Sequence, residues 1–301
     1  MTGLGALIRR NTKLYFKDKG LFFSSLITPV ILLVLYATFL KKVFDGSFRS
    51  ALEAAGATVS DSVINGVVGG QLVSSLLAVS CVTVAFCSNL LMIRDKTSGA
   101  RCDLTITPVR PATLAMGYYL ASLFSTIIVT LTAAAVCLGY LAWVGWYLTA
   151  GHVMALLLDV LLLTMFGIAL SSCINFWLTT DGQASAVGTI VSAGYGFICG
   201  AYMPISNFGE GLQKALSFLP GTYGTCLLRN HAMSGAFAEM ERLGFPAEVV
   251  QAIRDSVDCN LYFFDRPVAE GQMYLILAGS MGVLVALYVA FNRLGARRSA
   301  R

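Results

Sequence analysis

The sequence predicts an all-α integral membrane protein with six transmembrane helices, and three observations support this fold class. Of the 301 residues, 56% are hydrophobic and only 12% are charged, whereas soluble globular proteins carry about 25% charged residues. The chain also contains uncharged runs long enough to cross a bilayer, which takes roughly 20 apolar residues in a helix. Finally, Lys and Arg are distributed unevenly among the segments between these runs. A soluble protein needs a polar surface over its hydrophobic core, and so few charged residues cannot form one. Part of the surrounding solvent is therefore lipid.

The uncharged runs define the individual spans. The longest run, 111–158, holds one span and most of another, with a turn near Trp143, Trp146 and Tyr147, because these aromatic residues favour the membrane–water interface. No cleavable signal peptide is expected, since the first run starts only at Gly20 and is too long for a signal segment. The predicted spans are 20–42, 64–93, 111–141, 152–178, 183–203 and 271–292.

The basic residues predict the orientation of the spans. If both termini lie on one side, the segments on that side hold 13 of the 21 Lys and Arg residues but only four acidic ones. Short cytoplasmic segments are enriched in Lys and Arg, so we expect both termini and the loop 94–110 in the cytoplasm. These basic residues flank spans and form no stripe with interleaved aromatics, so no nucleic-acid partner is expected.

We treat the whole chain, 1–301, as a single transmembrane domain with short elements outside the spans. Residues 1–19 are predicted to form a cytoplasmic interfacial helix lying along the anionic inner leaflet; a plain basic flank of the first span is the alternative. One face of this helix is apolar and the rest carries the basic residues. The apolar face comprises Leu4, Leu7, Ile8, Leu14 and Tyr15.

Residues 204–229 are apolar but interrupted by proline and glycine, which exclude a straight spanning helix. We therefore expect an outer re-entrant hairpin of two short helices with a kink near Pro220. A polar outer insertion follows at 230–270, with a short amphipathic helix starting at Pro246 and an interfacial aromatic anchor at 261–265.

Small residues in the second and third spans indicate close helix packing, which they permit better than bulky residues. The second span carries Gly66, Gly69, Gly70, Ser74 and Ser75, and the third carries Ser122, Ser125 and Thr126 on one face.

Asp159 is the one acidic residue inside a predicted span, and His152 lies seven residues earlier on the same helix face. Intramembrane carboxylates are costly and often functional. Two interpretations are open: a proton- or cation-responsive site, or an Asp hydrogen-bonded to a neighbouring helix, which we favour. Cys226 and Cys259 lie on the same predicted side, and we expect free thiols there in preference to a disulfide.

The loop 94–110, with the sequence RDKTSGARCDLTITPVR, is polar and ends at prolines. The residues alone leave two equal interpretations, an ordinary solvated loop or a rigid element that receives a push from a soluble partner. Asp95, Gly99, Thr107, Pro108 and Val109 match the cytoplasmic loop of the membrane (permease) subunits of type-2 ABC exporters, which the chain resembles. Ala100, Arg101 and the position of Asp103 depart from that pattern.

A second block resembles the outer hairpin of the same family. It comprises Met203-Pro204-Ile205, then Leu219-Pro220-Gly221-Thr222-Tyr223, and Arg229, with Leu219 and Gly221 as departures. The resemblance extends over nearly the whole chain apart from 231–270.

The resemblance implies a permease half in a prokaryotic plasma membrane, paired with a second half, either an identical copy or a paralogue. This chain has no G-x-x-x-x-G-K-[ST] phosphate loop, so it is not expected to be an enzyme or to bind a cofactor or metal itself. Two copies of a separate ABC ATPase would bind ATP and Mg²⁺. Membrane lipids are the other expected partners. The residues assigned to ATPase coupling are Arg94, Asp95, Gly99, Asp103, Thr107 and Pro108, and those assigned to the hairpin are Pro204, Pro220, Tyr223 and Arg229.

The spans are rich in Leu, Val, Phe and Met, which favours export of an amphipathic or hydrophobic molecule such as a drug, an antimicrobial compound or a lipid. Export of a polysaccharide or lipid-linked glycan is the first alternative. An ion channel, a secondary carrier or an integral-membrane enzyme is less favoured, because secondary carriers show internal repeats and an enzyme needs convergent ionisable residues within the spans.

Overall fold

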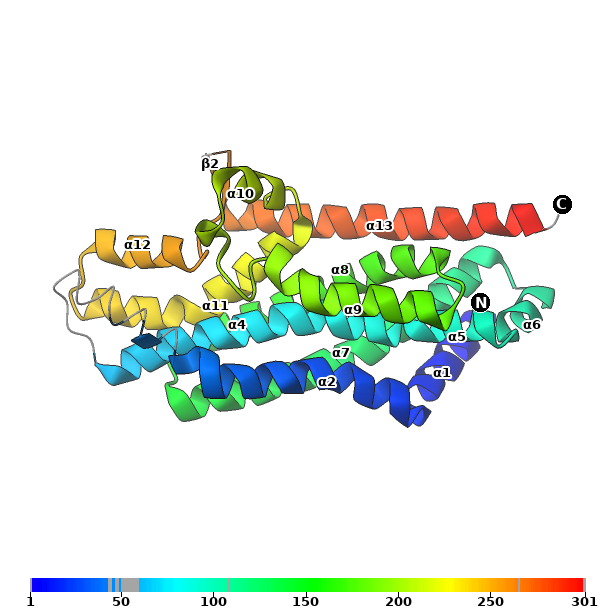
Figure 1. The fold of residues 1–301 in the computed structure, drawn as a ribbon, viewed down its shortest axis with the longest axis horizontal. Coiled ribbons are helices and arrows are strands. Elements are labelled where there is room, and N and C mark those ends of the chain that lie inside the picture. Colours follow the sequence, from blue (N-terminus) through cyan, green and yellow to red (C-terminus); the bar gives the residue numbers. More distant parts are fainter. Residues whose placement is uncertain are drawn as a thin grey trace.

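A computed structural model describes residues 2–42, 45–46, 49, 60–107, 109–264 and 266–299, and it is almost entirely helical (Figure 1). Most helices lie side by side along one long axis and form an elongated bundle. Both termini, α5 and α6 lie at one end, here called the termini end, and α12 lies at the opposite, far end.

The elements of the described residues are as follows. The first half contains α1 (Thr2–Lys17), α2 (Lys19–Leu35), the π-helix η1 (Tyr36–Leu40), α4 (Asp61–Ser88), α5 (Leu90–Thr97), α6 (Ala100–Ile106) and α7 (Pro111–Val144). The second half contains α8 (Ala150–Trp177), α9 (Asp181–Ile198), the 3-10 helix η2 (Ile205–Asn207), α10 (Glu210–Leu216), α11 (Pro220–Arg242), α12 (Ala247–Ser256) and α13 (Glu270–Ser299). The strands β1 (Tyr262–Phe263) and β2 (Arg266–Pro267) form a small antiparallel hairpin.

Four helical segments of the described residues are long and apolar enough to cross a membrane: 61–97, which joins α4 and α5, then α7, α8 and the 270–295 part of α13. A fifth is added if α1 and α2, which meet at 77°, count as one broken span. The predicted span 183–203 is shorter than expected, since α9 stops at Ile198 and Gly200 adopts a φ of +75°, a conformation that ends helices.

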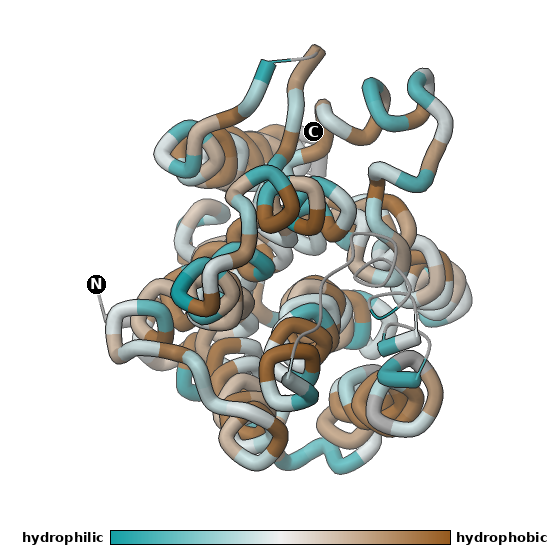
Figure 2. The backbone as a smooth tube through the Cα atoms, turned by 90° about the vertical axis from the view of Figure 1, so that its left-hand side faces the viewer, coloured by the Kyte–Doolittle hydropathy of each residue, from teal (hydrophilic) through white to brown (hydrophobic). Residues whose placement is uncertain are grey.

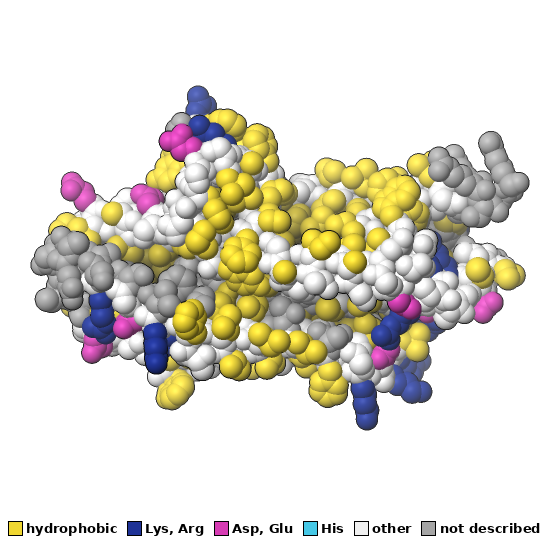
Figure 3. Space-filling model, viewed as in Figure 1, with side chains coloured by type: hydrophobic (Ala, Val, Ile, Leu, Met, Phe, Trp, Pro, Cys, Tyr) yellow, Lys and Arg dark blue, Asp and Glu magenta, His cyan; other side chains and the backbone are white. Residues whose placement is uncertain are grey.

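The charged side chains are segregated along the bundle. On the face shown in Figure 3, Lys, Arg, Asp and Glu lie toward the two ends and on the protrusion formed by α10 and the β-hairpin. The middle of this face is covered by hydrophobic and uncharged side chains. Seen along the bundle from the far end, the helices likewise carry long hydrophobic stretches (Figure 2). This pattern is the one expected of helices with a lipid-facing middle and hydrated ends.

The centre of the bundle is α4, which is buried along nearly its whole length between neighbours that include α7, α8 and α11. The small residues predicted to allow close packing lie in these contacts. A Cβ atom added at Gly70 would lie 2.7 Å from the carbonyl oxygen of Ala232 on α11, so only glycine permits this approach. Ser122 and Thr126 of α7 make hydrogen bonds to Asn89 and Ser88. The packing role predicted for both sets is therefore confirmed for these members.

The turn predicted between the third and fourth spans is present at residues 145–149. Thr149 caps α8, accepting a hydrogen bond from the backbone N–H of His152. Helix α8 begins at Ala150, two residues before the predicted start of 152. Trp143, at the end of α7, is 86% exposed.

The hairpin region differs from its prediction. The first short helix is α10, but the second is the 23-residue α11, which starts at Pro220 and continues through position 230 to Arg242. The boundary predicted between hairpin and insertion therefore lies within one helix. The reason is that α11 packs its buried face against α4 and α8 along its length, and tertiary packing sustains a helix whose own hydropathic pattern is weak.

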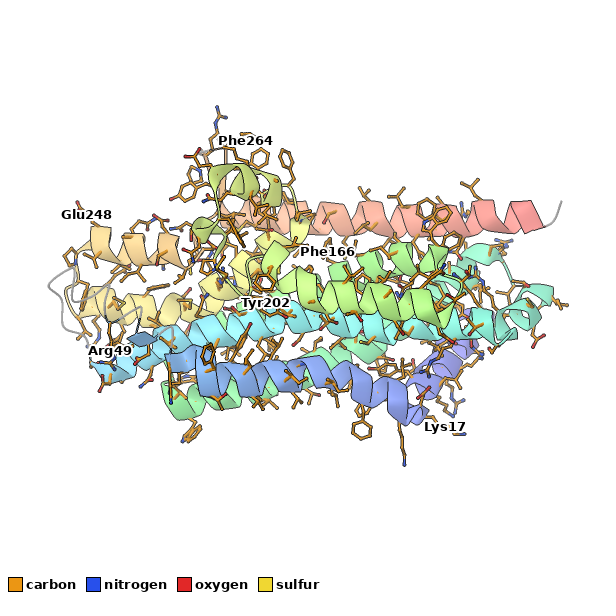
Figure 4. The ribbon with its side chains drawn as sticks, viewed as in Figure 1. Lys17, Arg49, Phe166, Tyr202, Glu248 and Phe264 are labelled. Carbon is orange, nitrogen blue, oxygen red and sulfur yellow. The ribbon has the colours of Figure 1, made fainter. Side chains whose placement is uncertain are left out.

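The rest of the insertion matches its prediction more closely. The amphipathic helix is present as α12, with Pro246 at its N-cap instead of its first turn. The aromatic segment 261–265 contributes β1, and Phe263 and Phe264 pack edge-on against Phe218 (Figure 4, where Phe264 points outward). Cys226 and Cys259 are free thiols, as expected, and the Cys226 thiol donates to the Cys259 carbonyl oxygen.

Candidate functional site

The predicted cytoplasmic loop folds into a tight helix–turn–helix. Gly99 joins α5 to α6 with a φ of +81°, a left-handed conformation that favours glycine. At the other end of α6, the Thr107 hydroxyl donates to the Leu104 carbonyl oxygen at 2.6 Å, which closes the helix; Pro108 lies outside the described residues. Cys102 and Asp103 are exposed, and Ile106 is 83% exposed. A short rigid helix therefore presents an open surface at the termini end.

Asp95 anchors this unit inside the bundle. Its side chain accepts two hydrogen bonds from Arg10 of α1, at 2.7 and 3.2 Å, and one from the Tyr118 hydroxyl of α7 at 2.6 Å. Asp95 is only 5% exposed, and paired guanidinium–carboxylate hydrogen bonds fix both distance and orientation. Asp95 thus joins α5 to α1 and α7.

Lys96 makes the corresponding connection to α8. Its ammonium group donates to the backbone carbonyl oxygens of Asn175, Phe176 and Leu178, at 3.1, 2.6 and 2.8 Å. These carbonyls lie at the C-terminal end of α8, where the last turn lacks helical donors and favours a cation. The ammonium also lies 5.5 Å from the centre of the Phe176 ring.

Two more basic residues complete the set of contacts. Arg94 forms an ion pair with Asp18, the residue at the bend between α1 and α2. Arg101 of α6 donates to the Asn292 side chain of α13 at 3.4 Å and lies 6.0 Å from the Phe176 ring centre. The α5–α6 unit therefore contacts α1, α8 and α13 through charged side chains.

Below this layer, Asn89 lies at the break between α4 and α5 and connects three helices. Its amide nitrogen donates to the hydroxyls of Ser171 and Ser172 on α8 at 2.8 and 2.7 Å, and its amide oxygen accepts from Ser122 on α7 at 3.1 Å. Asn89 is fully buried, and buried amides with satisfied hydrogen bonds hold helices in one register. A displacement of α5 would thus be passed on to α7 and α8.

At the other side of the bundle centre, the hairpin residues form a separate buried cluster. Arg229 of α11 pairs with Asp258 at 3.1 Å and donates to the Gly200 carbonyl oxygen. Asp258 in turn accepts hydrogen bonds from the backbone N–H groups of Ile205 and Ser206. This cluster holds the segment after α9 against α11 and the end of α12.

The other predicted hairpin residues shape the same segment. Pro204 is buried directly before η2, and Pro220 is the first residue of α11, where its missing N–H costs no hydrogen bond. The Tyr223 hydroxyl donates to the Ser217 carbonyl oxygen at 2.6 Å. The structure thus places the hairpin residues together, but far along the bundle from the residues assigned to coupling.

The structure does not bring His152 to Asp159. His152 takes part in the N-terminal cap of α8, where its Nδ1 accepts from the Thr149 backbone N–H at 3.4 Å. Asp159 instead contacts His231 of α11 at 2.5 Å and Tyr274 of α13 at 2.7 Å. The expectation that Asp159 is hydrogen-bonded to neighbouring helices is confirmed. Among the described residues no group of three or more His, Cys, Asp or Glu is arranged to hold a metal ion.

Sequence reasoning missed the partners that complete both clusters: Arg10, Lys96, Tyr118, Asn89, Asp258 and His231. Arg10 and Lys96 were counted only as charges that orient the spans. A signal was available for Asn89, which is an amide within an uncharged apolar run, and such residues are costly in a membrane unless they are paired. His231 and Asp258 lie in the segment judged to be a polar insertion, where nothing marked them.

Comparison with known proteins gives one family. The sequence profile described as "ABC-2 type transporter" matches residues 2–231, which include the α5–α6 unit, the Asp95 contacts, and Arg229. No curated protein matches the chain.

Proposed function

The chain belongs to the ABC-2 type transporter family as a membrane permease subunit, and from this premise we propose that it is one half of an ATP-driven exporter. As a multi-pass permease domain of this family it has no ATPase activity of its own. ABC-2 permeases generally pair with ABC ATPase subunits. The question for this chain is therefore where the ATPase binds and how its movement reaches the spans.

The observation that carries the proposal is the α5–α6 unit. Its outer helix is exposed, with Ile106 and Asp103 facing solvent, while Asp95 and Lys96 tie its base to three other helices. An exposed apolar residue on a short, braced helix suits insertion into a cleft of a partner. Movement of the ATPase would then displace α6, and the contacts of Asp95, Lys96 and Asn89 would pass that displacement to α1, α7 and α8.

The proposed topology follows from the same arrangement. We assign six spans, with α2–η1, α4, α7, α8, α9 and α13 as their helices, and with both termini and α6 in the cytoplasm. The position of both termini beside α6 (Figure 1) supports this assignment, as do the exposed basic residues of α1, among them Lys17, which points away from the bundle in Figure 4. Residues 204–229 and 230–270 would then lie at the outer side.

The partners follow from the family. A complete exporter would contain two permease halves, formed by two copies of this chain or by this chain and a paralogue, and two ATPase subunits that hold ATP and Mg²⁺. The proposed cargo is an amphipathic or hydrophobic molecule, since the spans are rich in Leu, Val, Phe and Met. Its location would be a prokaryotic plasma membrane.

Purification of the tagged full-length chain from its native membrane tests this proposal. We expect an ABC ATPase to co-purify, and we expect Ile106→Glu to reduce its recovery by roughly tenfold, the change produced by about 1.4 kcal/mol of lost binding. Leu243→Glu is the matched control, because Leu243 is a 51% exposed apolar residue at the far end. Elution without any nucleotide-hydrolysing subunit would contradict the proposal, and so would equal loss in both variants.

A further inference from the structure

Three ionisable side chains from three helices lie in a row in the far half of the bundle. The Asp159 carboxylate of α8 lies 2.5 Å from Nδ1 of His231 on α11, and Nε2 of the same imidazole lies 2.8 Å from the Glu270 carboxylate of α13. The Tyr274 hydroxyl, one turn further along α13, donates to the other oxygen of Asp159 at 2.7 Å. The row joins the start of α13 to the body of the bundle.

The row leads from the interior to water. The side chain of Asp159 is 1% exposed, that of His231 13% and that of Glu270 52%. Glu270 also lines a polar cavity of about 280 Å³ between α11, α12, the β-hairpin and α13, together with Asn230, Ser234 and Arg254. Protons from the aqueous phase at this end therefore have access to the buried carboxylate through His231.

The hydrogen-bond geometry requires a proton. Both ring nitrogens of His231 face a carboxylate oxygen at hydrogen-bond distance, but a neutral imidazole has one N–H only. With both carboxylates ionised, a neutral ring would direct a lone pair at one of them. The two bonds exist together only if the imidazole is charged or if a carboxyl group holds the proton.

We propose that Asp159, His231 and Glu270 form a proton-binding site that fastens the start of α13 to α8 and α11, so that the pH at this end of the bundle controls the packing of α13. With the proton bound, one cation bridges two anions. Without it, the buried Asp159 has no counter-charge, which is costly, and the contact between α13 and its neighbours opens. This property is independent of ATP-driven export.

The elements packed against α11 carry few other charged groups near the row. The α4 face that packs on α11 has no acidic or basic residue from Val63 to Ser88. From α12, Arg254 lines the same cavity as Glu270, and its guanidinium lies 5.0 Å from the centre of the Phe237 ring. The titratable groups in direct contact with the His231 ring are Asp159 from α8 and Glu270 from α13, with Tyr274 bonded to Asp159.

These neighbours set the direction of the pH response. Burial lowers the pKa of His231, but its hydrogen bonds and charge interactions with Asp159 and Glu270 outweigh burial and raise the pKa above the ordinary value of 6.5. Helix α11 is not among the candidate spans. A raised pKa means that the stabilisation is complete below pH 6.5 and is lost as the pH rises through the pKa of the folded protein.

The histidine content of the chain allows a direct test, because His152 and His231 are its only two histidines. The full-length protein, isotope-labelled at histidine and embedded in phosphatidylcholine–phosphatidylglycerol nanodiscs, is titrated by NMR from pH 5 to 9, with His152→Gln for assignment. We expect the His231 ring to keep both protons above pH 6.5, the ordinary histidine value, and Asp159→Asn to lower the pH at which one of these protons is lost. If the wild-type His231 ring loses its second proton at or below pH 6.5, the proposal is wrong.

A second measurement reports on the helix. Amide hydrogen exchange in residues 270–277, corrected for the intrinsic effect of pH, is expected to rise at least roughly tenfold from pH 6 to pH 9, the effect of losing one charge-assisted hydrogen bond. Residues 281–291 of α13 serve as internal control, and in His231→Gln the exchange should be fast at both pH values. Exchange in 270–277 that does not depend on pH would overturn the proposal. Neither experiment uses an ATPase or a cargo, so their outcomes are separate from those that test export.

Discussion

The Arg10 guanidinium contacts both oxygens of the Asp95 carboxylate, with Nη1–Oδ2 at 2.7 Å and Nη2–Oδ1 at 3.2 Å. The two residues are 85 positions apart in the chain, and the contact makes α1 and α5 one mechanical unit. Tyr118 donates to the same carboxylate, which brings α7 into the unit. Since α6 is the exposed part of this assembly, a push on α6 cannot move α5 without also moving α1 and α7.

We therefore expect Asp95→Asn to uncouple ATP hydrolysis from transport. The amide keeps the size of the side chain but removes the charge, so it cannot hold the guanidinium at two points. ATPase stimulation by cargo in the reconstituted complex should fall roughly tenfold, about 1.4 kcal/mol, while the ATPase should still co-purify because the exposed face of α6 is unchanged. Glu248→Gln, on exposed α12 (Figure 4), is the matched control. Stimulation that stays at the wild-type level would remove the coupling role from Asp95.

Lys96→Met should lower the thermal stability of the protein in detergent. The methionine fills similar space but leaves the carbonyl oxygens of Asn175, Phe176 and Leu178 without their shared donor, which costs about 1–3 kcal/mol. Lys13→Met, on the exposed face of α1, should change stability little. A similar melting temperature for the two variants would show that the contacts of Lys96 are replaced by water at no cost.

The sequence predicted the fold well for elements whose structure depends only on their own residues. The long uncharged runs predicted α7, α8 and α13 closely, because length and hydropathy alone determine whether a helix crosses a membrane. The prolines at the end of the loop 94–110 predicted the start of α7, which begins at Pro111, for a similarly local reason. Such features require no knowledge of neighbours.

The sequence predicted less well the features that depend on contacts with residues far away in the chain. It gave no sign that α11 continues past position 230, since that helix is sustained by packing on α4 and α8. It placed His152 on the same helix face as Asp159 and favoured a partner on a neighbouring helix, but it could not identify that partner, His231, which is 72 residues away. A periodicity argument can identify residues on one face of a helix, but it cannot identify what faces them.

Gly70→Ala should destabilise the bundle, because the added methyl group would lie 2.7 Å from both the Ala232 carbonyl oxygen and the Met233 Cγ atom. Overpacking of this kind costs about 1–3 kcal/mol. Gly188→Ala in α9 is the control, because a Cβ atom there meets nothing within 4 Å, and alanine in a helix is favoured over glycine by up to about 1 kcal/mol. Thermal unfolding should thus shift in opposite directions for the two variants, and equal shifts would argue against close packing of α4 on α11.

Arg229→Met should be more destabilising than the change at Gly70. It leaves Asp258 with a buried and unpaired charge, and breaking one side of a buried ion pair costs about 3–5 kcal/mol. In Arg229→Met/Asp258→Asn no charge remains, so part of the loss should be recovered. The measurement is a double-mutant cycle on unfolding free energies, with Arg242→Met as an exposed control on the same helix. Strict additivity of the two changes would mean that the pair contributes nothing as a pair.

The proposed orientation makes a prediction that needs no engineered residue. Cys102 on α6 is the one exposed cysteine of the eight, all of which lie in the described part of the chain. A membrane-impermeant maleimide should therefore label the protein in inside-out vesicles and not in intact cells, because thiol reactivity requires access to solvent. Cys102→Ser should abolish the labelling, and the bound ATPase should reduce it by covering α6. Labelling from the outside of intact cells would place α6 and both termini on the opposite side of the membrane, where no ATP-driven subunit can reach them.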